Sequence, residues 1–130
     1  MVDTALAQKL GIKPELPAYA LHAPTAYKHE LPMVTLVGST GALPEAAKWM
    51  QAFYAYQSSL KQEMAALKSR LAKDGQLWIC WPKRSAGIET DLNDSIVRTI
   101  GLGAGLVDTK VASINGIWSG LKFVYRLVDR

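Results

Sequence analysis

A short polar stretch in the second half of the chain carries the residue types best suited to hold an anion. Lys83 and Arg84 bring two cations, Ser85 and Thr90 bring hydroxyl groups, and Gly87 leaves the backbone open to close approach. Cations combined with unpaired backbone N–H groups at a helix start bind anions through charge and hydrogen bonding together. The stretch therefore predicts a site for a small anionic or nucleotide-like ligand.

The neighbouring elements place this stretch at the end of a strand. Residues 77–81 are five consecutive apolar residues, typical of a central strand covered on both faces, and Pro82 marks the end of that strand. Asp91, followed by Asp94, predicts the capped start of the next helix. Ligands of open α/β sheets bind beyond the carboxyl ends of the strands. The alternative interpretation is that both cations are solvated and that Asp91 itself satisfies the helix amides.

Two further positions could contact a ligand or a partner. Trp118, in a polar connection and followed by Ser119, Gly120 and Lys122, could stack on a flat ligand or anchor a partner protein. The alternative is that its ring folds back onto the core. His22 falls at the end of the first predicted strand, where catalytic groups collect in such sheets, although no motif for nucleophilic or general acid–base catalysis accompanies it.

The sequence predicts no metal site and names no cofactor. Cys80 is the single cysteine and lies inside the predicted buried strand, which excludes a disulfide framework and a thiolate cluster and predicts an inert thiol in a reducing compartment. Asp108 is expected to form surface ion pairs with Lys110 and Arg98.

Composition predicts one cytoplasmic domain spanning residues 1–130. The chain is 49% hydrophobic and 20% charged, which suffices for a hydrophobic core that needs no disulfides or structural metal ions. No signal peptide and no membrane span is predicted. The net charge is +4, but the cations are scattered among acids with no run longer than Lys83-Arg84, so a nucleic-acid partner is not expected.

Periodicity and turn signals predict the order of the remaining elements. A first helix capped by Asp3 should close at Gly11, and a long helix capped by Ser58 or Ser59 should run to Lys73 and end at Asp74-Gly75. The other predicted elements are strands 18–22 and 33–37, a helical turn 45–48, strand 50–56, helix 91–100, and a hairpin of strands 107–114 and 121–128. The glycines of residues 101–105 end a helix, so they are not a dinucleotide-binding fingerprint, which must follow a strand.

Several separated blocks of the second half resemble a family of small bacterial proteins classified only as a domain of unknown function. The blocks are, in order, Trp78-x-x-Trp-Pro-Lys83, Ser85-x-Gly87, Thr90-Asp-Leu92, Val97-Arg98, Gly105-Leu-Val-Asp-x-Lys-Val111 and Trp118-Ser-Gly-Leu-Lys-Phe-Val124. Gln8–Pro14 and His22-Ala-Pro24 also resemble that family. The region Thr25–Trp49 is shorter than in those relatives.

The element order is also similar to the later part of a class I methyltransferase. That resemblance implies a Rossmann-like scaffold and S-adenosylmethionine held by a glycine-rich loop after the first strand and an acid after the second. Here Ala23–Tyr27 contains no glycine, and Gly38-Ser39-Thr40 contains no acid. The resemblance thus implies the scaffold and argues against the usual chemistry.

We therefore expect an α/β domain with three layers, Rossmann-like, with a mainly parallel sheet and a C-terminal antiparallel hairpin. Three functions remain open. The first is a non-catalytic module that binds a small anionic or nucleotide-like ligand through Lys83, Arg84, Ser85 and Gly87. The second is a divergent S-adenosylmethionine-dependent transferase with Tyr27 or His22 near the cofactor. The third is a protein-interaction subunit that pairs with itself or another chain through the Trp118 loop or an edge strand.

Overall fold

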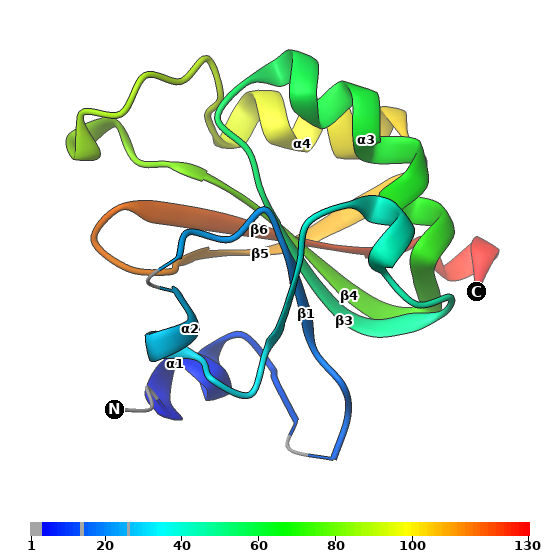
Figure 1. The fold of residues 1–130 in the computed structure, drawn as a ribbon. Helices are drawn as coiled ribbons and strands as arrows, with labels where there is room; N and C mark the ends of the chain where they lie inside the picture. The colour runs from blue at the N-terminus through cyan, green and yellow to red at the C-terminus, as the bar shows by residue number, and fades with distance from the viewer. Residues whose placement is uncertain (1–3, 14, 26) are drawn as a thin grey trace.

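Figure 1 shows the computed structural model, which describes residues 4–13, 15–25 and 27–130. A central sheet separates two helical layers. Helices α3 (Gln57–Arg70) and α4 (Asp94–Gly103) cover one face, and the short helices α1 (Thr4–Lys9) and α2 (Tyr27–Glu30) cover the other. The predicted three-layer α/β fold is confirmed.

The sheet has six strands in the order β2-β1-β3-β4-β6-β5. Their bounds are β1 (Tyr19–Leu21), β2 (Thr35–Val37), β3 (Ala47–Phe53), β4 (Leu71–Pro82), β5 (Leu106–Ser113) and β6 (Trp118–Tyr125). The pairs β1–β2, β1–β3 and β3–β4 are parallel, whereas β6 runs antiparallel to both β4 and β5. The mainly parallel sheet and its C-terminal antiparallel hairpin are therefore as predicted.

Strands β3 and β4 are central because both of their faces are apolar. Met50 and Leu77 are register partners that pack under α3 and α4, and neither is exposed to solvent. Trp49 and Trp78 point to the opposite face, where both indole N–H groups donate to the Leu10 carbonyl oxygen, at 2.9 and 3.1 Å. Burying side chains on both faces is what allows a continuous apolar run to form a strand.

The long helix ends earlier than its sequence predicts. It was expected to run to Lys73 and close at Asp74-Gly75, but α3 ends at Arg70 and the chain passes directly into β4. Gly75 lies inside that strand, where an added Cβ would sit 2.6 Å from the Ala47 carbonyl oxygen of β3. The glycine is needed for close approach of two strands rather than for a helix C-cap.

The proline-rich first third forms short elements, as expected, with two qualifications. Gly11 has a φ of +74° and closes α1 as predicted, whereas Asp3 lies outside the described residues. The helical turn predicted for residues 45–48 is wrong because Ala47 already begins β3. The 3₁₀ turn η1 (Thr40–Ala42) precedes it.

The C-terminal hairpin has a shorter connection than predicted. Strand β6 begins at Trp118 and stops at Tyr125, and the last residues form the 3₁₀ turn η3 (Leu127–Asp129) instead of continuing the strand. The glycine-rich segment 101–105 ends α4, as the sequence predicts. An added Cβ at Gly101 would lie 2.0 Å from the Phe123 ring, so this glycine lets α4 seat directly on β6. No helix in the described part of the chain is long and apolar enough to cross a membrane.

Candidate functional site

A groove of about 820 Å³ opens at the carboxyl end of β4, and we call it the β4 groove. Its walls are the connection between β4 and α4, the first residue of α4 and four strand residues. The lining residues are Trp81, Pro82, Lys83, Arg84, Ser85, Ile88, Glu89, Thr90, Asp91, Leu92, Asn93, Asp94, Val111 and Ser119. The groove is thus built mainly by one continuous loop, at the end of the strand where ligands of open α/β sheets bind.

Backbone and hydroxyl hydrogen bonds fix the shape of this loop. The Lys83 N–H donates to the Ile117 carbonyl oxygen at 2.7 Å, and the 3₁₀ turn η2 (Arg84–Ala86) closes on Gly87, which has a φ of +71°. The Thr90 hydroxyl donates to the Ala55 carbonyl oxygen at 2.5 Å and accepts from the Leu92 N–H at 3.1 Å. Gly87 and Thr90 therefore shape the loop.

The two cations of the β4 groove differ in whether they bond to other parts of the protein. The Lys83 ammonium donates to Ser113 Oγ at 2.5 Å, which ties the loop to β5. Arg84 is exposed, and within the described part of the chain no hydrogen bond or ion pair reaches its guanidinium. Arg84 is consequently the cation of the groove that is available to an incoming anion.

Acidic side chains line the same groove. Glu89 accepts a short hydrogen bond from the Tyr56 hydroxyl, and this contact raises the pKa of Tyr56. Asp94, at the start of α4, adds a second exposed carboxylate. A simple anion would meet repulsion from these acids, so the groove suits a ligand that also offers hydroxyl or amine donors.

Asp91 caps a different helix from the one predicted. The Gln57 N–H at the start of α3 donates to Asp91 Oδ1 at 2.7 Å, and the Gln57 side-chain amide donates to the Asp91 carbonyl oxygen at 3.1 Å. Helix α4 is capped instead by Asn93, whose Oδ1 accepts from the Ile96 N–H at 2.8 Å. The predicted caps Ser58 and Ser59 lie inside α3. The expectation of Asp91 capping α4 is wrong, because its carboxylate serves a helix more than thirty residues earlier.

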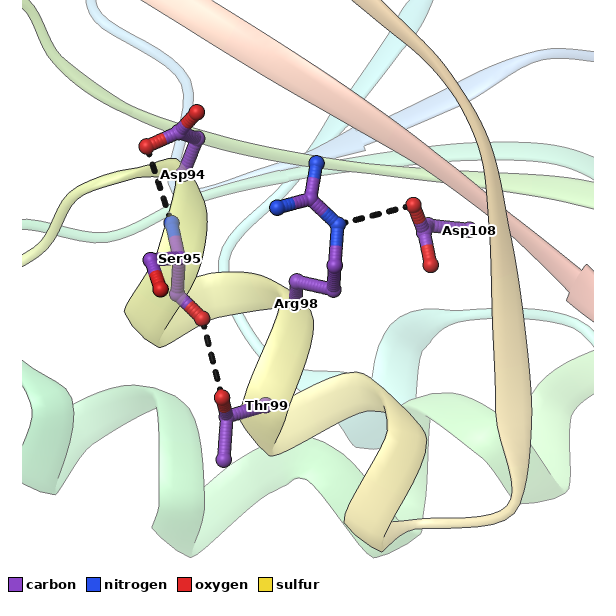
Figure 2. A network of polar contacts seen from close by, with 5 residues as sticks. All are labelled: Asp94, Ser95, Arg98, Thr99 and Asp108. Carbon is purple, nitrogen blue, oxygen red and sulfur yellow. Dashed lines mark hydrogen bonds and ion pairs between the residues drawn. The ribbon is translucent and has the colours of Figure 1, made fainter.

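Helix α4 is also tied to the edge strand β5, as Figure 2 shows. Arg98 Nε donates to Asp108 Oδ2 at 2.9 Å, and this hydrogen bond raises the pKa of Arg98. Of the two predicted partners of Asp108, Arg98 is confirmed, whereas Lys110 Nζ donates to the Lys9 carbonyl oxygen at 3.2 Å. At the helix start Asp94 Oδ1 accepts from the Ser95 N–H at 2.9 Å, and one turn later Thr99 Oγ1 donates to the Ser95 carbonyl oxygen at 3.0 Å. These contacts hold the helix whose first residue, Asp94, lines the β4 groove.

A second, smaller hollow of about 340 Å³ lies where β1 and β3 end side by side, and we call it the β1/β3 crevice. The strand order reverses at this point, since β2 follows β1 on one side and β3 returns to its other side. Ligands of doubly wound sheets bind at such switch points.

Three side chains from three elements meet in the β1/β3 crevice. Glu63 Oε1, from α3, accepts from the Tyr54 hydroxyl at 2.7 Å and lies 2.9 Å from His22 Nε2. The His22 and Tyr54 rings contact edge to face, with centroids 5.7 Å apart. Burial, with the Glu63 hydrogen bond, raises the pKa of Tyr54. His22 holds a φ of +58°, a backbone conformation that is costly for a residue with a side chain.

The predicted site residues thus fall into three separate places. Lys83, Arg84, Ser85 and Thr90 line the β4 groove together, with Gly87 in the same loop, whereas His22 lies in the β1/β3 crevice. Trp118 packs edge to face on Phe53, with centroids 5.1 Å apart, on the α1–α2 face of the sheet. Lys122 is the register partner of Trp78, which belongs to that same face. The tryptophan ring rests on the core rather than standing in a solvated loop.

Sequence patterns did not identify Tyr54 and Glu63. Each lies in a segment read only for its secondary structure, and no motif links them to His22. Cys80, as expected, is fully buried, and burial raises the pKa of its thiol to about 12. Among the described residues, no group of three or more histidine, cysteine or acidic side chains could hold a metal ion.

Comparisons with known proteins identify the fold. No protein-family model matches the chain, and no curated protein matches it in sequence. Magnesium protoporphyrin IX methyltransferase from Synechocystis PCC 6803, solved with bound SAH, is 9% identical, with a TM-score of 0.64 over 95% of this chain and 81% of that one. A TehB-like SAM-dependent methyltransferase from Corynebacterium glutamicum is 9% identical, with a TM-score of 0.59 over 95% and 87%.

A SAM-dependent methyltransferase from Aquifex aeolicus is 16% identical, with a TM-score of 0.58 over 94% of this chain and 78% of that one. Identities this low show a shared fold and carry no activity with them. The chain has the Rossmann-like α/β fold of the class I SAM-dependent methyltransferases.

Proposed function

We propose that this protein is a non-catalytic module that binds a small nucleotide-like ligand in the β4 groove. The observation that carries the proposal is the charge arrangement of the groove. Arg84, beside Lys83, offers a guanidinium that no hydrogen bond or ion pair from the described residues engages, and Glu89 and Asp94 line the same groove. A phosphate can be held by the cations while ribose hydroxyls donate to the carboxylates.

The engagement of the other polar groups supports recognition rather than proton transfer. The Thr90 hydroxyl, the Asp91 carboxylate and the Lys83 ammonium each already hold part of the chain, by the bonds to Ala55, Gln57 and Ser113 described above. Groups committed to fixing a loop preorganise a binding surface, because they need not be ordered again when ligand arrives.

The test is a thermal-shift titration with AMP, ADP, inorganic phosphate and sulfate. A ligand at about one hundred times its dissociation constant stabilises the folded state by about 2.7 kcal/mol, which is a readily measured shift. We expect ADP to stabilise the wild type and to lose most of its effect on Lys83→Ala/Arg84→Ala. The matched control, Lys13→Ala/Lys110→Ala, removes two exposed cations elsewhere and should respond as the wild type does. Equal responses of the two double variants would contradict the proposal.

A second candidate is a divergent S-adenosylmethionine-dependent transferase, and the shared fold is the observation that favours it. The residues at the ends of the first two strands do not fit the usual cofactor grip. His22 and Ala23 follow β1 where a glycine-rich loop would be needed, and Gly38 and Ser39 follow β2 where an acid would be needed. The His22, Tyr54 and Glu63 side chains also occupy the switch point itself.

Isotope-labelled S-adenosylmethionine in equilibrium dialysis separates the two candidates. The transferase predicts saturable binding, together with chemical-shift changes at the amides of His22 and Tyr54. The binding module predicts changes confined to residues 83–94 and caused by ADP.

A further inference from the structure

The fold gathers cations that are far apart in the sequence into one cluster near the start of β4. Lys68 from α3 and Lys73 from β4 lie over the ring of Tyr125, and Arg126 and Arg130 come from the segment that follows that residue. We call these four residues the basic cluster. Figure 1 shows the C-terminal turn beside the end of α3, away from the loop of residues 83–94 that lines the β4 groove. The cluster is therefore distinct from that groove.

Each member of the basic cluster lies close to Tyr125 or Gly105. The ammonium groups of Lys68 and Lys73 lie 5.7 and 4.3 Å from the centroid of the Tyr125 ring. Arg130 Nε donates to the Tyr125 carbonyl oxygen at 2.9 Å. A Cβ added at Gly105 would lie 2.7 Å from Lys68 Nζ and 3.7 Å from Arg126 Nη2, so these two cations flank the same point of the backbone.

Structural roles account for only part of this charge. Lys68 donates to the Ala104 carbonyl oxygen at 2.9 Å, which stabilises the carboxyl end of α4. Arg126 Nε donates to Asp129 Oδ2 at 3.0 Å. Residues 64–73, 103–107 and 125–130 carry five cations when Arg70 is included, and one acid, Asp129. The acids that directly flank these segments, Glu63, Asp74 and Asp108, bond to Tyr54, Lys48 and Arg98. Within the described part of the chain, Lys68, Lys73 and Arg130 therefore form no ion pair with an acid.

The two arginines of the basic cluster use only their Nε groups in the bonds that hold them. Arg126 Nε donates to Asp129, and Arg130 Nε donates to the Tyr125 carbonyl oxygen. Neither bond uses the Nη groups. A guanidinium oriented in this way presents a planar fork that matches phosphate oxygens. The cleft of about 630 Å³ between α3 and α4 shares Lys68 with the cluster, and its other lining residues include Lys61 and Thr99 but no acid.

We propose that the basic cluster binds the phosphate backbone of a nucleic acid strand, independently of base sequence. Phosphodiester recognition needs clustered cations and little else, and it releases counterions from the strand. The scatter of Lys and Arg along the sequence concealed this footprint, because its members come from the end of one helix, the start of one strand and the C-terminal segment.

The test measures binding of a fluorescently labelled single-stranded oligonucleotide, as RNA and as DNA, by anisotropy over a range of salt concentrations. Four phosphate contacts predict a slope of log K against log salt of about −3. Lys73→Glu/Arg130→Glu should weaken binding at low salt by at least about tenfold and roughly halve the slope. Lys13→Glu/Lys110→Glu lowers the net charge equally and should leave most of the affinity intact. Amide shifts should map to residues 68–73 and 125–130.

Each other outcome overturns the proposal. Equal loss in the two charge-matched variants would mean that net charge alone attracts the oligonucleotide. Equal competition by poly-glutamate would assign the cluster to acidic proteins.

Leu127 and Val128 are 78% and 87% exposed beside the cluster. Binding to phosphatidylserine vesicles that is stronger than oligonucleotide binding, and is lost in Leu127→Ser/Val128→Ser, would assign the cluster to a lipid surface. Circular dichroism confirms that each variant is folded.

Discussion

The β4 groove and the β1/β3 crevice lie at the same end of the sheet but are built in opposite ways. Most of the groove comes from one loop, residues 83–94, whose polar groups bond to its own backbone and to neighbouring segments. The crevice is closed by single side chains from three distant segments, which meet at the Glu63 carboxylate. A site formed by contiguous residues leaves a sequence pattern, whereas one assembled from separate elements does not.

The largest effect is expected where α4, whose first residue lines the β4 groove, packs against β6. Gly101→Val places a side chain on the Phe123 ring, since even a Cβ would be 2.0 Å from it. Overpacking of this kind costs on the order of 3 kcal/mol. Urea unfolding measures the loss. The control is Gly103→Ala, where nothing lies within 4 Å of the added Cβ, and it should be neutral or slightly stabilising. Similar losses in both variants would contradict the close seating of α4.

The fold could be predicted from the sequence where local chemistry decides it, and only there. The apolar run before Pro82 predicted the central strand because a strand buried on both faces leaves no other pattern. Gly75 was misread because a glycine that ends a helix and one that allows two strands to approach look alike in sequence. Asp91 was assigned to the nearer helix since nothing in the sequence reveals that its carboxylate reaches Gln57. Glu63 carries no signal at all, because only the fold brings it to His22.

Glu63→Ala should destabilise the protein by removing the carboxylate at which the side chains of the β1/β3 crevice meet. Tyr54 is 4% exposed, and its hydroxyl would lose the acceptor it now uses. An orphaned buried hydroxyl costs about 1–3 kcal/mol, which urea unfolding should show as a lower free energy of unfolding. Lys61→Ala, an exposed position of α3 that does not line the crevice, is the control.

A double-mutant cycle isolates the cause of that loss. Tyr54→Phe in the Glu63→Ala background removes the orphaned hydroxyl, so the double variant should be more stable than Glu63→Ala alone. Strictly additive losses would show that the hydroxyl and the carboxylate do not act as a pair.

Alkaline pH should lower the free energy of unfolding, because Tyr54 ionises more easily in the unfolded state than in the folded one. Burial and the Glu63 hydrogen bond raise the pKa of Tyr54 in the folded state, whereas an unfolded tyrosine titrates near pH 10. The contribution of Tyr54 to the free energy of unfolding is therefore complete below about pH 10 and is lost as the pH rises beyond it. The loss is at most about 1.4 kcal/mol per pH unit for this group. Tyr54→Phe should make the decline of unfolding free energy between about pH 9 and pH 11 shallower than in the wild type. Parallel declines would exclude Tyr54 as a contributor.

The smallest effect tests the residue that joins the two regions. Asp91 lines the β4 groove and caps α3, the helix that carries Glu63 to the β1/β3 crevice. Its replacement by Ala should cost about 1 kcal/mol, as the loss of an N-cap does, and Asn93→Ala should cost about as much through α4. Hydrogen exchange separates the two, because Asp91→Ala should accelerate the Gln57 amide and Asn93→Ala the Ile96 amide. If Asp91→Ala instead exposed the Ile96 amide, the carboxylate would serve the helix that follows it, and the groove and the crevice would not share this support.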